Sequence, residues 1–394
     1  MKSVKISDCL SKMSNSYVFG RVAERKKEYE SGCNNAEIID LGIGDLKGPL
    51  IEQAANALVE ASSEQRTRAF FRGYGPYEGY DFCRKAVCDY YFRSANVKIS
   101  PSEVFIGDGA KSAIQRIMSL FDCETAVFSP AYPAYIDCIT ALGKKCVVIK
   151  RSEENDFSPD FGALGSKPRL VILCSPDNPT GYALRRERAD EILKYCRKSR
   201  SVILFDAAYE SYCGGDKIRS LYETEEMRRY VVEVGSLSKS ACFTGLRVGW
   251  TIVPEEIADG KLKKTYSRVI AATYNGCPYV AQRAAQKALG RQADGERAAL
   301  IGDIKQSAQI LKKAFISAGF SVFGGEDAPY LWVKSAPVLS GEDAFEYFLT
   351  RLAIVVTPGE GFGKGCTSFF RVSALAGPEQ AQAAVKRIKE HFAF

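Results

Sequence analysis

Residues Ser236–Arg247 read Ser-Leu-Ser-Lys-Ser-Ala-Cys-Phe-Thr-Gly-Leu-Arg and lie between two apolar runs of strand length. Lys239 stands among small and hydroxyl residues, with Arg247 eight positions further on. A lysine in a loop is usually a solvated surface charge. Here it also fits a lysine that holds a carbonyl cofactor as a Schiff base beside a phosphate site. The rest of the chain decides between these two interpretations.

Around this segment, from about residue 102 to 253, strand-length apolar runs alternate with helical patterns of 10 to 15 residues. Leu170–Cys174 is a continuous apolar run, as is typical of a strand buried on both faces. The alternation predicts an α/β domain with a mostly parallel sheet flanked by helices. We expect a helix over 183–197 and further strands at 104–106, 126–128, 146–149, 202–205, 230–234 and 248–253.

The pattern changes after about residue 274, where helices are expected at 280–289, 302–318 and 378–392. Short strands are expected between them, at 330–333, 353–356 and Phe369–Ser373. This mixture predicts a smaller α+β domain. We therefore expect an N-terminal segment over 1–40 that packs with the small domain, a large α/β domain over 41–275, and the small domain over 276–394.

The chain has a single histidine, His391, close to its C-terminal end. Ser-His-Asp and Cys-His catalysis, histidine general bases and histidine-based zinc sites all need a residue type that is nearly absent. If the protein is an enzyme, lysine, tyrosine and aspartate must move its protons, or a cofactor must help. No metal site is expected.

Composition points to a globular protein with a packed core. Hydrophobic residues make up 46% and charged residues 26% of the chain, and no apolar run has the length of a membrane span. The net charge of +7 is spread over short clusters, which disfavours nucleic acid as a partner. Thirteen cysteines without a C-x-x-C pair are expected to be buried free thiols in the reducing cytoplasm.

Polar residues follow several expected strands, where ligands bind in open α/β sheets. Gly107-Asp-Gly-Ala-Lys111 begins a helix, so the backbone around Gly109, Ala110 and Lys111 can hold a phosphate. Asn178, fixed by the proline after it, can donate to a cofactor phenolate. Asp206 at a strand end is either a helix cap or a buried charge that needs a partner such as a pyridinium N–H.

Read together, these segments resemble the fold-type I pyridoxal-phosphate enzymes of the class I and II aminotransferase group. The resemblance rests on S-P-x-N-P-T-G at 175–181, D-x-x-Y at 206–209, S-x-S-K at 236–239 and R-x-G at 247–249. It implies that Lys239 carries pyridoxal 5'-phosphate and moves the substrate proton. It also implies that Asp206 keeps the pyridine nitrogen protonated and that Tyr132 stacks on the ring.

The resemblance assigns the remaining polar residues to the cofactor and the substrate carboxylate. Asn178 and Tyr209 are implied to bond the 3'-oxygen of the cofactor. Arg371 is implied to take the substrate α-carboxylate as a bidentate pair. The phosphate is implied to bind Ser236, Ser238, Arg247 and the backbone of Gly109, Ala110 and Lys111.

Several longer stretches resemble the LL-diaminopimelate aminotransferase family, among them D-L-G-I-G-D at 40–45, F-T-G-L-R-V-G-W at 243–250 and A-P-Y-L-W at 328–332. That family transfers an amino group between LL-2,6-diaminopimelate and 2-oxoglutarate, and the keto product cyclises to tetrahydrodipicolinate in lysine and peptidoglycan precursor synthesis. The resemblance implies that Tyr17 and Gly44 lie at the substrate and that Tyr74 and Asn275 complete the site. Tyr74 is implied to come from a second subunit, which makes the protein a homodimer.

One departure from this family concerns the far end of the substrate. Where the family reads Y-G-A-E-Q-G, with its glutamate at the distal ammonium group, this chain reads Tyr74-Gly-Pro-Tyr-Glu-Gly79. The acid is absent at Tyr77 and appears one place later, at Glu78. We therefore expect a broader range of amino donors than the family norm.

Three other functions compete with this one. The first is another fold-type I reaction, either a different amino-acid aminotransferase or a β-lyase, because such sites differ by few residues. The second is a transcription regulator with an aminotransferase-like domain, which is disfavoured because no helix-turn-helix pattern precedes the sheet. The third is a nicotinamide dehydrogenase, which is disfavoured because no G-x-G-x-x-G opens a helix.

Overall fold

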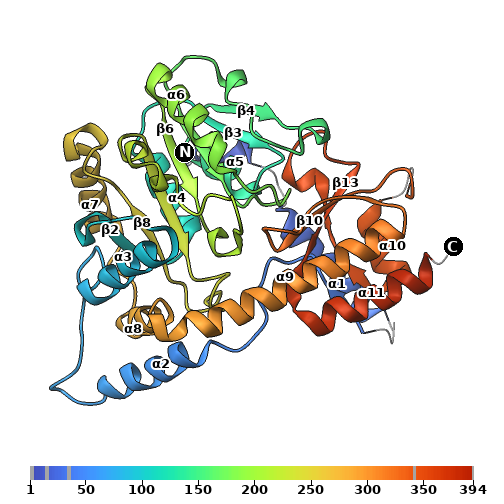
Figure 1. Cartoon of the computed structure of the whole chain (residues 1–394), viewed down its shortest axis with the longest axis horizontal. Coiled ribbons are helices and arrows are strands. Elements are labelled where there is room, and N and C mark those ends of the chain that lie inside the picture. The colour runs from blue at the N-terminus through green and yellow to red at the C-terminus, as the bar shows by residue number, and fades with distance from the viewer. Residues whose placement is uncertain (1–3, 14–16, 33–36, 340–342, 393–394) are drawn as a thin grey trace.

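The computed structural model describes residues 4–13, 17–32, 37–339 and 343–392. A large α/β domain is built on a seven-stranded sheet in the order β2-β8-β7-β6-β5-β3-β4 (Figure 1). Strand β8 runs antiparallel to both of its neighbours, and the other pairs are parallel. The strands are β2 (Val104–Gly107), β3 (Thr125–Ser129), β4 (Cys146–Lys150), β5 (Leu170–Cys174), β6 (Val202–Asp206), β7 (Val231–Ser236) and β8 (Gly249–Ile252).

Helices cover both faces of this sheet. The side chains on its two faces accordingly belong to two different clusters of packed hydrophobic residues. Leu204 of β6 belongs to one cluster, with Ile117 of α4, and its neighbours Ile203 and Phe205 belong to the other, with Ile192 of α6. The helices of the large domain are α2 (Glu52–Glu64), α3 (Asp81–Ala95), α4 (Ala110–Ser119), α5 (Pro133–Ala141), α6 (Ala189–Ser199), α7 (Lys261–Thr273) and α8 (Tyr279–Ala288).

The small domain has an antiparallel sheet in the order β12-β13-β10-β9. Its elements are α9 (Asp294–Ser317), β9 (Ser321–Gly324), β10 (Tyr330–Lys334), α10 (Ala344–Leu352), β11 (Ile354–Val355), β12 (Thr357–Pro358), β13 (Phe369–Ser373) and α11 (Pro378–His391). Strand β1 (Ile39–Asp40) pairs in parallel with β11, so the chain leaves the small domain just before it enters the large one.

The fold class is confirmed, and the differences from the expected elements have local causes. Helix α9 begins at Asp294, eight residues before the predicted start at 302, and Asp294 and Glu296 in its first turn suit the positive end of the helix dipole. Of the expected strand over 353–356 only β11 (Ile354–Val355) forms, and β12 begins after it, at Thr357. Residues 183–197 form a helix only from Ala189, after a short 3-10 turn.

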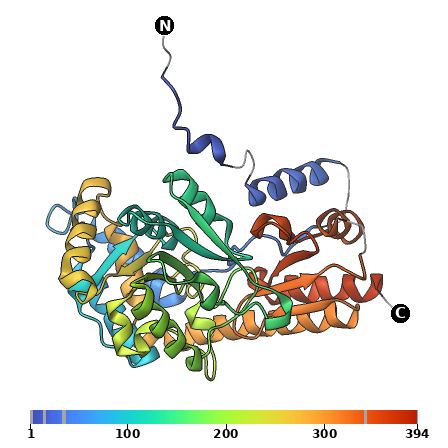
Figure 2. The ribbon, with the colours of Figure 1, turned by 90° about the horizontal axis from the view of Figure 1, so that it is seen from above.

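Helix α1 (Val18–Ser31) lies against the small domain. Figure 2 shows it beside the C-terminal part of the chain, while the segment before it extends away. Arg21 and Arg25 form ion pairs with Glu360 and Glu346 of the small domain. The expected role of the whole N-terminal segment, of which residues 1–3, 14–16 and 33–36 are outside the described ranges, remains a prediction.

The expected boundary after residue 275 remains a prediction. Side chains of α8, such as Ala281 and Ala285, pack in the same cluster as the large sheet, and so does Ala293. This packing favours a later boundary, near the start of α9. Within the described residues, no helix is long and apolar enough to cross a membrane.

Candidate active site

A cavity of about 270 Å³ opens at the carboxyl ends of strands β2, β3, β5, β6 and β7. Its size is close to the lower end of small-molecule sites. Ten residues that the sequence predicted for the site line it: Ala110, Lys111, Tyr132, Asn178, Asp206, Tyr209, Ser236, Ser238, Lys239 and Arg247. The edge of a sheet thus brings together residues that are far apart in the chain.

Lys239 follows β7 and is buried in this cavity. Burial lowers the pKa of its ammonium group to about 8; the carboxylate of Asp45 opposes this, and the positive charges of Arg371 and Arg247 add to it. Its Nζ donates a hydrogen bond to the backbone carbonyl of Gly44. A lysine with this pKa has a substantial neutral fraction near neutral pH, which a nucleophilic amine requires.

Asp206 is the last residue of β6 and its carboxyl group is buried. It accepts hydrogen bonds from the hydroxyl of Tyr135 at 2.6 Å and from the backbone N–H of Ala208 at 3.1 Å. Burial raises its pKa, and these two hydrogen bonds oppose the rise. Because no described lysine or arginine forms an ion pair with it, this acid is available to a cationic ligand atom in the cavity.

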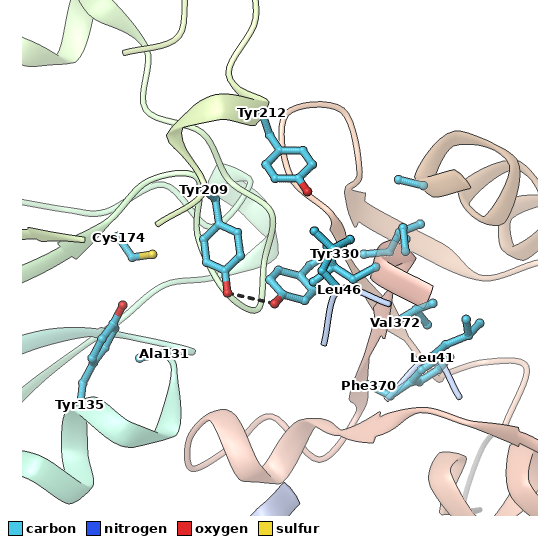
Figure 3. Packing of buried hydrophobic residues seen from close by; sticks show 14 of the residues in the cluster. Leu41, Leu46, Ala131, Tyr135, Cys174, Tyr209, Tyr212, Tyr330, Phe370 and Val372 are labelled. Atoms are coloured by element: carbon cyan, nitrogen blue, oxygen red, sulfur yellow. Dashed lines mark hydrogen bonds between the residues drawn. The ribbon is translucent and has the colours of Figure 1, made fainter. Parts of the chain in front are cut away.

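Two tyrosines after β6 connect this site to the small domain and to Lys239. The hydroxyls of Tyr209 and Tyr330 share a hydrogen bond at 2.9 Å (Figure 3). Tyr212 donates from its hydroxyl to the backbone carbonyl of Lys239 at 2.8 Å. The lysine backbone is therefore fixed by a buried aromatic residue that does not line the cavity.

The loop before α4 and the segment 236–247 form a cradle for an anion. Gly109 precedes the first turn of α4 with φ of +111°, and a Cβ there would lie 2.4 Å from Nη2 of Arg247. Ser236 donates from its hydroxyl to Ser238 at 3.0 Å, and Arg247 donates to the same serine Oγ at 3.4 Å. Helix dipole, guanidinium and hydroxyl groups together suit a phosphate dianion.

Arg371 of β13 is almost fully buried but has no carboxylate partner among the described residues. It donates to Oδ1 of Asn178 at 2.8 Å and to the carbonyl of Gly42 at 2.6 Å. Its guanidinium carbon lies 4.5 Å from the ring centre of Tyr330 and 5.1 Å from that of Phe19. Its Nε has no hydrogen-bond partner, so a buried donor is left for an anionic ligand.

The turn that presents Asn178 is held by a buried ion pair. Asp177 accepts hydrogen bonds from Arg151 at 2.9 Å and from the hydroxyl of Thr180 at 2.6 Å. These contacts fix the Asn-Pro-Thr-Gly turn after β5. The amide of Asn178 is thereby placed between Arg371 and the cavity.

Other predicted site residues lie around the cavity rather than in its lining. Tyr17 lies beside Lys111, whose Nζ is 5.5 Å from its ring centre, and burial raises the pKa of its hydroxyl. Gly44 presents its carbonyl to Lys239, and a Cβ at Gly44 would lie 2.6 Å from the hydroxyl of Tyr330. Tyr74, Tyr77 and Asn275 are exposed in this single chain.

Glu78 points to another part of the chain. Its carboxylate accepts a hydrogen bond from the hydroxyl of Ser267 of α7 at 2.7 Å, and its backbone carbonyl accepts from Ile106 at 2.8 Å. Tyr77 is 43% exposed, so neither residue lines the cavity of one chain.

The sequence analysis missed five residues that line the cavity: Asp45, Ile114, Tyr135, Ala208 and Thr244. Asp45 and Thr244 lie in stretches that carried the family resemblance, but they had no role assigned. Tyr135 is three residues after Tyr132 at the start of α5, a spacing that places both on one face of a helix. That spacing was the available signal for a second aromatic residue in the site.

Residues 36–388 match the family model for aminotransferase class I and II. The chain belongs to the class I and II aminotransferases. Members of this family use pyridoxal 5'-phosphate, and the sequence expectation of this cofactor and of a fold-type I enzyme is confirmed.

Relatives of this aminotransferase cover its whole length. It is 35% identical to an LL-diaminopimelate aminotransferase of Azobacteroides pseudotrichonymphae, with 99% of this chain and 100% of that protein covered. It is 34% identical to that of Agathobacter rectalis, with 98% and 99% covered. The solved L,L-diaminopimelate aminotransferase of Chlamydomonas reinhardtii is 34% identical, covers 100% of both chains and superimposes with a TM-score of 0.92.

The aminotransferase cavity fits its cofactor on the evidence of its own side chains. Pyridoxal phosphate needs an amine, a phosphate cradle and an acid for its ring nitrogen. Lys239, the Gly109–Arg247 cradle and the buried Asp206 supply these three groups. Because residue 109 has no side chain, Nη2 of Arg247 can lie close to the start of α4.

Proposed function

We propose that the protein transfers an amino group between LL-2,6-diaminopimelate and 2-oxoglutarate, which gives tetrahydrodipicolinate and glutamate. The observation that carries the proposal is the buried, unpaired Arg371 in a chain that matches LL-diaminopimelate aminotransferases from end to end. Both substrates bear an α-carboxylate that this guanidinium can bind in a bidentate pair.

Each residue of the cavity then has a defined task. Pyridoxal phosphate supplies the electron sink for loss of the substrate α-proton. Lys239 would hold the cofactor covalently, and its Nζ would carry the substrate α-proton. Asp206 holds a proton on the ring nitrogen, since a buried carboxylate favours a cationic partner. Tyr132 covers the ring face, and Asn178 and Tyr209 donate to the ring oxygen.

The phosphate end of the cavity anchors and orients the cofactor. Ser236, Ser238, Arg247 and the N–H groups of Ala110 and Lys111 at the start of α4 would hold its phosphate group. Anchoring at this end fixes the distance between Lys239 and the reactive atom. A fixed distance is what makes proton transfer by one lysine efficient.

We also propose a homodimer with shared active sites. Phe70, Phe71, Tyr74 and Tyr77 expose large apolar side chains in one chain, at 56%, 62%, 89% and 43% respectively. The extended loop that carries them lies at the outer edge of the large domain, after α2 (Figure 1). Exposed aromatic residues gathered in one loop favour a protein contact. Tyr74 would reach the site of the other subunit from this loop, and Asn275 would help complete the site.

The range of amino donors is proposed to be broader than that of the relatives. The side chain at position 77 is a phenol, and Glu78 is engaged by Ser267. The distal ammonium group of diaminopimelate therefore has no dedicated acid from this loop. Donors without a distal ammonium group lose no contact there, so the preference for diaminopimelate over them should be weaker than in the relatives.

Steady-state rates with LL-diaminopimelate, meso-diaminopimelate, glutamate, aspartate, lysine and ornithine test both parts of this proposal. We expect LL-diaminopimelate to be used, together with at least one other donor, and the reaction to require a 2-oxo acid. Release of ammonia without a 2-oxo acid would indicate a β-lyase instead. Absence of any LL-diaminopimelate reaction would overturn the substrate, and a strict LL preference would overturn the broad range.

The cytoplasm is the proposed location. Among the described cysteines none forms a disulfide, as suits a reducing compartment. Cys33 lies outside the described residues.

A further inference from the structure

Two active-site cations are bound by one short loop. Residues 41–46 connect β1 to the large domain and are called here the 41–46 loop. The carbonyl of Gly42 accepts from Arg371 at 2.6 Å, and the carbonyl of Gly44 accepts from Lys239. The position of this loop therefore affects both the proposed carboxylate arginine and the proposed cofactor lysine.

The loop is held at its start by the carboxylate of Asp40. Oδ1 accepts the backbone N–H groups of Gly42 at 3.1 Å and Ile43 at 3.3 Å. Oδ2 accepts from Nζ of Lys26 of α1 at 2.8 Å. The side chain of Asp40 is only 4% exposed, so its charge depends on these partners, whereas that of Lys26 is 25% exposed.

Helix α1 approaches the same arginine by a second route. Phe19 lies with its ring centre 5.1 Å from the guanidinium carbon of Arg371, and Lys26 lies two turns further along the helix. One face of α1 thus contacts Arg371 directly and, through Asp40, the loop that accepts its hydrogen bond.

Little room is left for the loop to adapt. A Cβ at Gly42 would lie 2.7 Å from Cγ1 of Val355, and Thr357 donates from its hydroxyl to the Gly42 carbonyl at 2.6 Å. The N–H of Gly42 is accepted by the carboxylate of Asp40. Because Gly42 is closely packed, loss of that carboxylate must either move the Gly42 carbonyl or expose it. Either change alters the hydrogen bonding of Arg371.

We infer that Lys26 and Asp40 are positioning residues, which fix the 41–46 loop and through it the guanidinium of Arg371 for carboxylate binding. The inference rests on the proposed function, in which Arg371 binds the substrate α-carboxylate. Lys26 and Asp40 themselves touch neither substrate nor cofactor.

Substitutions at Lys26 and Asp40 should disturb the 41–46 loop to different degrees. Lys26→Met leaves a buried carboxylate without its counter-ion, and such a charge is costly. Asp40→Asn keeps an oxygen acceptor for the loop N–H groups and leaves Lys26 close to solvent. Lys26→Met should therefore disturb the loop more than Asp40→Asn, and Asp40→Ala should disturb it most.

Arg25→Met is the matched control. Arg25 lies next to Lys26 on α1 and bonds Glu346 of α10 at 2.8 Å, so its loss removes an ion pair from the same helix but not from the loop. Lys26→Arg keeps the charge and should restore most of the wild-type behaviour.

The test combines hydrogen exchange of the cofactor-free protein with steady-state kinetics of the loaded enzyme. We expect faster exchange over 41–46 in Lys26→Met and Asp40→Ala, with wild-type exchange there in Arg25→Met. We also expect KM for both the amino donor and 2-oxoglutarate to rise about tenfold while kcat changes less than threefold, since ground-state binding is lost.

Unchanged exchange over 41–46, or a KM no higher than that of Arg25→Met, would overturn the inference. Failure of the proposed function is seen separately, because wild type would then not convert LL-diaminopimelate with 2-oxoglutarate. A variant that fails to fold is identified by fast hydrogen exchange over the whole chain. In that case Asp40→Asn gives the decisive comparison. We expect its KM to rise less than that of Lys26→Met.

Discussion

The guanidinium of Arg371 in the small domain donates to the amide oxygen of Asn178 in the large domain at 2.8 Å. This bond is buried and joins β13 to the turn after β5. In the proposed function, Arg371 binds the substrate α-carboxylate and Asn178 donates to the cofactor ring oxygen. Under that proposal, substrate binding and domain contact therefore share this one arginine.

Asn178→Asp should impair carboxylate binding. The new carboxylate would lie within hydrogen-bond distance of Arg371 and would compete with the substrate for it. We expect KM for both substrates to rise at least about tenfold, which corresponds to about 1.4 kcal/mol. Asn178→Ala removes the acceptor without adding a charge, so equal KM values in the two variants would contradict this account.

Labelling of Lys239 by an amine-directed reagent should follow its lowered pKa. In cofactor-free protein we expect half-maximal labelling near pH 8, against about 10.4 for an ordinary exposed lysine, measured by peptide mass spectrometry. Arg371→Met should move the midpoint upward, because a neighbouring positive charge is removed, and Asp45→Asn should move it downward. A midpoint near 10 in wild type would be inconsistent with burial of this amine.

The same lowered pKa predicts how the stability of the cofactor-free protein depends on pH. The unfolded chain holds the proton of Lys239 up to about pH 10.5, and the folded chain loses it at about pH 8. The free energy of unfolding should therefore rise between pH 8 and 10.5, by about 3 kcal/mol from this residue. Lys239→Met should remove that rise, as denaturant titrations of both proteins at several pH values would reveal.

Asp206→Asn should reduce turnover while cofactor binding persists. A neutral amide cannot stabilise a proton on the ring nitrogen, and the expected loss in kcat is on the order of 100-fold or more. Tyr135→Phe removes only the hydroxyl that donates to Asp206, so we expect a smaller loss of about tenfold. Equal losses in the two variants would show that the carboxylate acts chiefly through this hydrogen bond.

Gly109→Ala should weaken cofactor binding through the phosphate cradle. Its methyl group would meet Nη2 of Arg247 at 2.4 Å, and the positive φ is unfavourable for alanine. We expect the Kd for pyridoxal phosphate to rise more than tenfold in equilibrium dialysis. Gly107→Ala is the control, because its nearest neighbour would be Nη1 of Arg116 at an ordinary 3.8 Å, and a similar Kd in both variants would argue against the cradle.

The predictable part of the site consists of short local motifs at strand ends. Asp206, Asn178 and Lys239 follow apolar runs that are visible in the sequence, and parallel strands bring their ends to one edge. Arg371 was found by its apolar neighbours and by family resemblance. The assigned roles of all these residues remain predictions, which the variants above test.

The unpredicted part depends on contacts between distant segments. The bond between Lys26 and Asp40 joins a helix to a strand end, and nothing in either local pattern indicates it. Strand β9 is partly exposed and pairs only with β10, so it lacks the apolar run by which other strands were found. The predicted helix over 302–318 began too late, because the buried Arg297 looks like a surface residue in the sequence.

Helix α9 spans the two packed clusters of the protein. Leu300 packs against both of them, while Ile304 and Leu311 belong to the cluster that the small domain shares with one face of the large sheet. Arg297 donates to the carbonyl of Ala288 at the end of α8. Because one continuous helix belongs to both domains, neither can lose its structure without exposing apolar surface of the other. The two domains should therefore unfold cooperatively, in a single thermal transition.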